Sequence, residues 1–203
     1  MNKKGYNISY VRRIDFVSKE DKHVCPVWAG YLLANPLRAL MHNPKKILSP
    51  YIKKDMTVMD IGCAMGFFSL PLAQMVGEKG KVICIDLQKE MLDKLEKRAK
   101  QKKLLEKLEI IACTEDSLCI DKYQASLDFV LAFAVAHETQ DVNKFLLQIY
   151  NSLKKDAKLL LVEPKSHVPK KVIEDILKTA QDIGFKLNSR GNYPFARGLT
   201  LQK

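Results

Sequence analysis

The fold is decided by residues 58–69, which read Val58-Met59-Asp60-Ile61-Gly62-Cys63-Ala64-Met65-Gly66-Phe67-Phe68-Ser69. An apolar strand ends in this stretch, a glycine-containing turn follows it, and a helix begins after the turn. Glycine at positions 62 and 66 lets the backbone turn sharply and lets a ligand approach the main chain, because no Cβ stands in the way. The first such turn of an open parallel sheet lies at the carboxyl ends of the strands, where ligands bind.

Short apolar strands and amphipathic helices alternate along the rest of the chain. Strands are predicted over 57–61, 81–85, 108–112, 127–133 and 158–163, and helices over 67–75, 89–102, 142–153 and 170–183. This alternation is typical of a parallel sheet with helices on both faces. The end of the chain departs from it, since 185–188 and 199–202 flank the turn-rich 189–194 and predict a closing antiparallel hairpin.

These patterns predict one α/β domain over residues 51–203, with a doubly wound, mostly parallel, seven-stranded sheet and an antiparallel C-terminal hairpin. Its size is ordinary for a single domain, because the whole chain has 203 residues. Residues 1–50 precede the domain, and within them residues 26–48 look helical in two pieces, broken at Asn35-Pro36 and Asn43-Pro44. We expect them to form an N-terminal helical lid.

A carboxylate at the end of the second predicted strand adds to the signal of the glycine turn. The strand reads Val82-Ile83-Cys84-Ile85-Asp86, which places Asp86 24 positions after Gly62. A carboxylate there can accept hydrogen bonds from both hydroxyls of a ribose. The glycine spacing is neither the dinucleotide fingerprint GxGxxG nor a phosphate-binding P-loop, since three residues separate the two glycines and no Gly-Lys-Ser/Thr follows.

The pattern Asp60-x-Gly62-x-x-x-Gly66 followed by Asp86 resembles the class I methyltransferases that use S-adenosylmethionine, and their small-molecule branch most closely. The resemblance covers residues 50–203. It departs from the family at one position, because the family usually has a middle glycine where Ala64 stands. It implies a Rossmann-like methyltransferase fold, S-adenosylmethionine as cofactor, and methyl transfer to a small-molecule acceptor.

The resemblance also implies which residues bind the cofactor. Asp60 would order the turn and face the amino group of the methionine part, and Gly62 and Cys63 would contact that part through their backbone. Asp86 would hold the ribose. The remaining expected contacts are Gly66 in the turn, Leu87 against adenine, either Glu115 or Asp116 at the adenine amine, and Phe133 beside the methionine part.

Three side chains are candidates for catalysis. His137 follows the fourth predicted strand and could act as a general base, because imidazole titrates near neutral pH, or could only cap or orient the following helix. Glu163 ends the fifth predicted strand and could hold a polar acceptor, act as base, or pair with Lys165. His23 lies in the predicted lid near Trp28. It could take part in catalysis, or this segment could only pack its helix against the domain.

The net charge of +11 has two interpretations: a lysine-rich surface that keeps the protein soluble, which we favour, and a basic surface that attracts nucleic acid. Residues 1–55 hold 11 Lys or Arg against 4 Asp or Glu. An RNA methyltransferase that uses this basic region is therefore an alternative, and a non-catalytic module that binds S-adenosylmethionine is another. Nucleic acid is disfavoured as the acceptor. Enzymes that methylate amines of DNA and RNA carry an Asn/Asp-Pro-Pro-Tyr/Phe motif at the end of the fourth strand, and this chain has Phe133-Ala134-Val135-Ala136 there instead.

No metal site is expected, because no cysteine pair has CxxC spacing and the His and Cys spacings match no standard site. The chain shows no secretory signal and no apolar run long enough to cross a bilayer, so a cytoplasmic protein with no membrane partner is predicted. The sequence leaves the acceptor, the attacked atom and the oligomeric state open.

Overall fold

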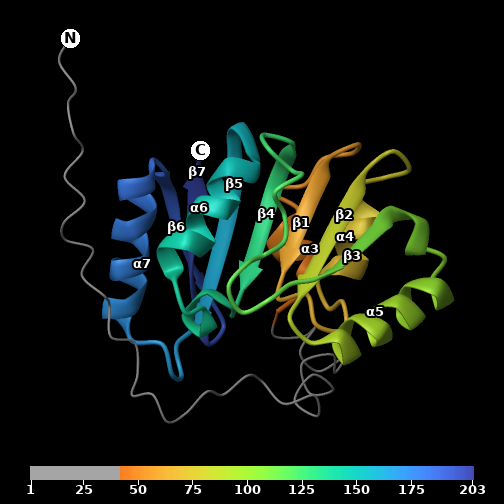
Figure 1. Cartoon of the computed structure of the whole chain (residues 1–203), viewed down its shortest axis with the longest axis horizontal. Coiled ribbons are helices and arrows are strands. Elements are labelled where there is room, and N and C mark those ends of the chain that lie inside the picture. Colours follow the sequence, from red (N-terminus) through yellow and green to blue (C-terminus); the bar gives the residue numbers. More distant parts are fainter. Residues whose placement is uncertain (1–41) are drawn as a thin grey trace.

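A seven-stranded sheet with the order β3-β2-β1-β4-β5-β7-β6 runs through the described residues, 42–203, of the computed structural model (Figure 1). Its strands are β1 (Thr57–Ile61), β2 (Lys81–Asp86), β3 (Leu108–Ala112), β4 (Leu127–Phe133), β5 (Leu153–Pro164), β6 (Lys186–Tyr193) and β7 (Ala196–Gln202). The first five strands pair in parallel, and β7 runs antiparallel to both of its neighbours. The predicted doubly wound sheet with an antiparallel C-terminal hairpin is confirmed.

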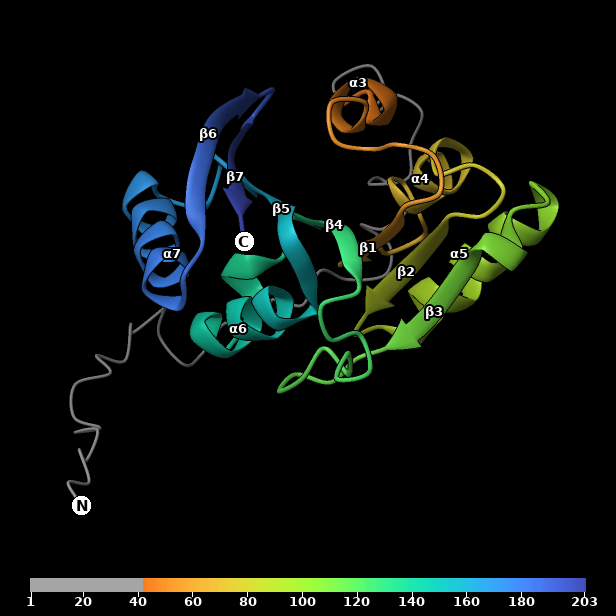
Figure 2. The same cartoon turned by 90° about the horizontal axis from the view of Figure 1, so that it is seen from above.

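The helices divide between the two faces of the sheet (Figure 2). One face is covered by α3 (Pro44–Leu48), α4 (Ser69–Met75) and α5 (Lys89–Gln101), and the other by α6 (Val142–Ser152) and α7 (Lys170–Ile183). Two 3-10 turns, η1 (Leu105–Lys107) and η2 (Ala136–Glu138), complete the elements of the described region. The chain from β3 to β4 crosses without a helix of its own.

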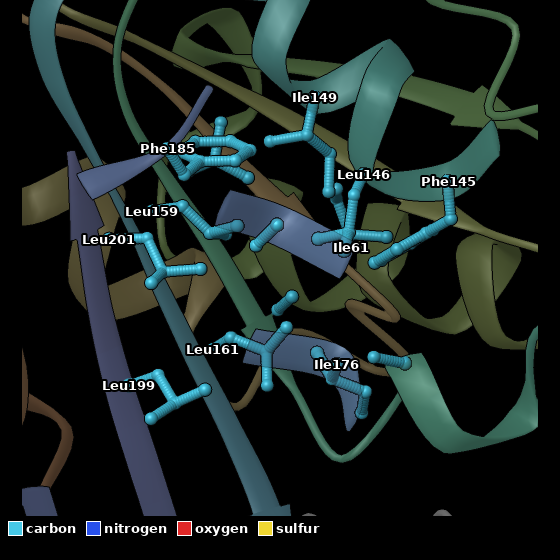
Figure 3. Packing of buried hydrophobic residues seen from close by; sticks show 14 of the residues in the cluster. Ile61, Phe145, Leu146, Ile149, Leu159, Leu161, Ile176, Phe185, Leu199 and Leu201 are labelled. Carbon is cyan, nitrogen blue, oxygen red and sulfur yellow. The ribbon is translucent and has the colours of Figure 1, made fainter. Parts of the chain in front are cut away.

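Alternation along the central strands builds two separate cores. Successive side chains of a strand point to opposite faces. In β1, Val58 packs with α3, α4 and α5, whereas Met59 and Ile61 pack with α6 and α7. Figure 3 shows part of the second core, where Ile61, Leu159, Leu161, Leu199 and Leu201 of the sheet meet Phe145, Leu146, Ile149 and Ile176 of the helices. Because both faces are covered, the central strands are apolar almost throughout.

The hairpin is longer than predicted. The stretch 189–194 was expected to form a turn, but residues up to Tyr193 belong to β6, and only Pro194 and Phe195 separate it from β7. The expectation was wrong because β6 is an edge strand, whose polar side chains stay exposed while its backbone pairs with β7. Two smaller differences are that β5 begins at Leu153 and α4 at Ser69.

Most of the predicted lid lies outside the described residues, which begin at His42, and so does His23. From the predicted lid, α3 is described, and it buries Ile47 and Leu48 in the core beside α4. Across residues 42–203, no helix has both the length and the apolar character needed to span a bilayer.

The turn between β6 and β7 contains a strained residue. Phe195 has a φ of 57° and is 71% exposed. A bulky residue in this left-handed conformation costs roughly 1 kcal/mol, whereas Asn tolerates it. We therefore expect Phe195→Asn to raise the melting temperature by about 2–4 °C. Calorimetry of this variant beside Phe195→Leu, which keeps the strain, checks the expectation; equal melting temperatures would count against it.

Candidate functional site

The turn after β1 has an unusual backbone. Gly62, Ala64 and Gly66 have positive φ angles of 71°, 44° and 84°. Glycine adopts such angles at little cost, but an L residue with a side chain loses roughly 1–2 kcal/mol. Ala64 is therefore a site of local strain, at the position where the methyltransferases that the motif resembles usually have glycine.

The two glycines make room for other parts of the protein. A Cβ at Gly62 would lie 3.2 Å from the Val135 side chain, and a Cβ at Gly66 would lie 2.4 Å from Cδ1 of Leu95. Leu95 belongs to α5 and is fully buried. A Cβ at position 66 would force the end of the buried Leu95 side chain to shift, so helix packing favours glycine there as well as the φ angle does. From the sequence we expected glycine at 62 and 66 only to let a ligand approach the main chain. The structure adds a second role, which is to make room for neighbouring side chains of the protein itself.

The end of β2 fixes the turn through hydrogen bonds. The N–H groups of Gly62 and Cys63 both donate to the carbonyl oxygen of Ile85, at 2.9 and 3.0 Å. The N–H of Ala64 donates to Oδ2 of Asp86 at 2.8 Å. Since the two N–H groups are already engaged, Gly62 and Cys63 can offer a ligand their carbonyl oxygens, which are acceptors. The carbonyl of Cys63 already accepts from the N–H of Gly66 at 2.9 Å and has its second lone pair for a ligand.

Asp60 joins β1 to α4. It is 2% exposed, and its Oδ2 accepts a hydrogen bond of 2.5 Å from the hydroxyl of Ser69, the first residue of α4. A buried carboxylate needs such partners to remain charged. The position suits the predicted role of Asp60 in ordering the turn, and its contact with a cofactor stays a prediction.

Asp86 lies at the junction of three segments. Besides Ala64, its carboxylate accepts a hydrogen bond of 2.9 Å from the N–H of Gln88, just before α5. Burial raises the pKa of Asp86, although the backbone N–H groups of Gln88, Ala64 and Leu87 counteract part of the rise. The next side chain, Leu87, is 38% exposed, which is unusual for a large apolar residue in this molecule. A polar group and an apolar surface thus stand side by side at the edge of the sheet.

The other expected cofactor residues lie around this edge. Glu115 and Asp116 are exposed in a turn closed by Thr114 and Ser117, and Oε2 of Glu115 accepts a hydrogen bond of 2.5 Å from Gln140. Both acids stay candidates for the adenine amine. Phe133, at the end of β4, is half-buried between the rings of Phe68 and His42, with centroid distances of 4.8 and 5.4 Å.

The structure brings together two of the predicted catalytic residues. Glu163 is fully buried, and its two oxygens accept hydrogen bonds from the N–H of Ala136, at 2.8 Å, and from Nδ1 of His137. Pairing of Glu163 with Lys165 is excluded as its main contact, because the Lys165 ammonium instead donates to Oδ1 of Asn192 at 2.6 Å.

His137 does not cap the following helix, because α6 is capped by Asp141, whose side chain accepts from the N–H of Lys144. Burial lowers the pKa of His137, but the hydrogen bond and charge of Glu163, helped by the charge of Glu138, outweigh burial and leave the pKa above its ordinary value. His137 can therefore hold a proton near neutral pH.

His167 was missed as a site residue by the sequence interpretation. Its Nε2 lies 3.1 Å from Nε2 of His137, and its Nδ1 lies 3.0 Å from the hydroxyl of Ser166. Its position could have identified it from the sequence, because it lies four residues after Glu163 in the turn at the carboxyl end of a central strand. Among residues 42–203, no group of three or more His, Cys, Asp or Glu side chains is arranged to hold a metal ion.

Comparison with known proteins identifies the family. A family model described as a methyltransferase domain matches residues 52–190. A demethylmenaquinone methyltransferase from Lactobacillus johnsonii is 28% identical over 105 residues, which are 52% of this chain and 42% of that protein. A 23S rRNA (uracil(1939)-C(5))-methyltransferase from Acinetobacter baumannii is 41% identical over 49 residues, which are 24% of this chain and 11% of that protein. The chain thus matches less than half the length of these curated relatives.

Among solved structures, a SAM-dependent methyltransferase from Aquifex aeolicus superposes with a TM-score of 0.77 at 26% identity, covering 87% of this chain and 98% of that one. The chain therefore belongs to the methyltransferase-domain family, and its fold is that of the class I S-adenosylmethionine-dependent methyltransferases. The resemblance inferred from Asp60, Gly62, Gly66 and Asp86 is confirmed at the level of the family.

Exchanging glycine and alanine within the turn tests its packing. We expect Gly66→Ala to lower the free energy of unfolding by about 1–3 kcal/mol, because it combines a positive φ with a clash against buried Leu95. Ala64→Gly relieves a positive φ instead and should leave stability unchanged or slightly higher. Urea unfolding of the two variants gives the comparison, and equal losses in both would show that the turn is not constrained as described.

Proposed function

We propose that this chain binds S-adenosylmethionine at the carboxyl edge of the sheet and transfers its methyl group to a small-molecule acceptor. The observation that carries the proposal is the position of Asp86, which ties the glycine turn to the start of α5 and stands beside exposed Leu87. When bound, the cofactor supplies a methyl group on a sulfonium, so the protein has to position the reactants and manage a proton.

The donor set of the site suits this cofactor. The carbonyl oxygens of the turn and the carboxylate of Asp60 are acceptors, which favours the positively charged amino group of the methionine part. Asp86 would accept from the ribose hydroxyls with the lone pairs that its backbone donors leave available. Leu87 would cover one face of the adenine. Cys63 and Gly66 would shape the turn, and Phe133 would border the methionine part.

His137 and Glu163 provide the acid–base chemistry of the proposal. Glu163 binds Nδ1 of His137, so Nε2 is the nitrogen that can take up a proton lost by the attacking atom of the acceptor. The side chain of His137 is 14% exposed and that of Glu163 is 0% exposed. Burying such a pair is costly. A module that only bound the cofactor would have no need for it, which argues against the non-catalytic alternative.

The acceptor is proposed to be a small molecule because the match to the demethylmenaquinone enzyme is twice as long as the match to the rRNA enzyme, 105 against 49 residues. The absence of the Asn/Asp-Pro-Pro motif after Phe133 points the same way. The net charge of +11 and the short rRNA-enzyme match keep RNA as the second candidate. We also propose that residues 1–50 form a lid and that His23 takes part in catalysis. The structure describes only residues 42–50 of this segment.

Removal of the Asp86 charge tests cofactor binding. We expect Asp86→Asn to weaken S-adenosylmethionine binding by about 1–3 kcal/mol, roughly 5- to 150-fold, since it loses charged hydrogen bonds to the ribose. Asp93→Asn is the matched control, because Asp93 lies on the exposed face of α5 and, within residues 42–203, its side chain pairs with Lys89. Calorimetric titration of each variant with S-adenosylmethionine gives the result. A titration of the wild type with NAD should show no binding, since the glycine spacing is not the dinucleotide fingerprint GxGxxG. Unchanged affinity in Asp86→Asn would refute the ribose assignment.

Methyl transfer can be followed without knowing the acceptor. The full chain is incubated with methyl-tritiated S-adenosylmethionine and either the low-molecular-weight fraction of a bacterial extract or total RNA. We expect label in the small-molecule fraction and about a 100-fold or greater loss of rate in His137→Gln, the scale of a removed general base. The affinity of that variant for the cofactor should be unchanged. Label found only in RNA would establish the alternative.

A further inference from the structure

His167 continues the pair formed by Glu163 and His137. It is exposed, and it lies in the turn between β5 and α7. The imidazole rings of His137 and His167 have centroids 4.9 Å apart and an interplanar angle of 60°, and their Nε2 atoms are 3.1 Å apart. This geometry is that of a direct hydrogen bond between the two rings.

The positions of the protons follow from the partners. Glu163 accepts from Nδ1 of His137, so in the neutral state Nε2 of His137 carries a lone pair. It can then accept only from an N–H at Nε2 of His167. That tautomer leaves a lone pair on Nδ1 of His167, which accepts from the Ser166 hydroxyl. One assignment of protons therefore satisfies the whole chain from Ser166 to Glu163.

Both ring nitrogens of His137 are engaged, and its side chain is only 14% exposed. An acceptor molecule cannot reach His137 without first displacing His167. The ring nitrogen at the outer end of the chain is Nδ1 of His167, whose partner is the hydroxyl of exposed Ser166. Because His167 and Ser166 are both exposed, an acceptor can take the place of the Ser166 hydroxyl at Nδ1 of His167. His167 is thus the accessible base, with His137 and Glu163 behind it.

We propose that His167 is the outer base of this site and passes the proton it receives inward, so that the positive charge comes to rest on His137 beside Glu163. The inference rests on the proposed methyl transfer. The X–H bond of the acceptor breaks and its proton goes to Nδ1 of His167, while the proton on Nε2 of His167 moves to Nε2 of His137. The electron pair left on X forms the bond to the methyl carbon, and the pair of the broken methyl–sulfur bond stays on sulfur.

The charges around the two rings favour this direction of transfer. Glu163 faces His137 from β5, and Oε1 of Glu138 lies 3.9 Å from Nε2 of His137. On the other side, Arg197 of β7 donates to the carbonyl of Val168, the residue after His167. The two carboxylates therefore lie beside the inner ring, where they stabilise a positive charge on His137. Accordingly, the pKa of His137 is raised despite its burial.

Nitrogen-15 NMR titration of the imidazoles in the full chain tests the relay without an acceptor. We expect His167→Ala to lower the titration midpoint of His137 by about 0.5–1 pH unit, because a hydrogen bond from a charged donor is stronger than one between neutral rings. Lys165→Ala, a change on the same turn, should leave the midpoint in place. A midpoint that stays or rises in His167→Ala overturns the proposal.

Turnover gives the second readout. In the labelled-methyl assay, His167→Gln should lose at least about 10-fold in kcat, because Gln keeps a donor toward His137 but cannot carry a proton. Its affinity for S-adenosylmethionine should equal that of the wild type. If methyl transfer is found and His167→Gln retains full kcat, the relay is wrong while the proposed function stands. If Asp86→Asn binds the cofactor as well as the wild type does, the ribose assignment fails and the NMR result still decides the relay.

Discussion

The carboxylate of Asp86 is the interaction on which the site depends. Its two oxygens receive the N–H groups of Ala64 and Gln88, and so hold the glycine turn after β1 against the start of α5. The carbonyl of Ile85 adds two more hydrogen bonds to the same turn. Because β1 and β2 are neighbouring parallel strands, these bonds align the ends of both strands in one rigid edge. A ligand at this edge meets acceptors whose positions are fixed before it binds.

The fold was largely predictable from the sequence because its signals are local. Strand and helix periodicities located every strand and α-helix from β1 to α7, though not the two 3-10 turns, and Asp60, Gly62, Gly66 and Asp86 identified the family. The hairpin was misjudged at 189–194 because pairing with β7, which no local pattern shows, overrides the turn preference of polar residues. The packing of Gly66 against Leu95 is equally non-local, since 29 positions separate the two residues.

The site was predictable in part. The ends of parallel strands meet at one edge, so residues after β4 and β5 were expected to lie together, and His137 does meet Glu163. The choice among the three roles proposed for Glu163 could not be made from sequence, because side-chain direction at a strand end depends on packing. His167 was missed for the same reason: a turn residue 30 positions from His137 gives no periodic signal.

These observations join into one account, in which a rigid edge holds the cofactor and a chain of three side chains, Glu163, His137 and His167, handles the proton. The most direct test is a crystal structure of the full chain with S-adenosylhomocysteine. The account predicts both ribose hydroxyls on Asp86, the amino group against the carbonyl oxygens of the glycine turn, and the sulfur directed toward the side of the two histidines. A sugar held elsewhere, with Asp86 bound only to its two backbone donors, would contradict it.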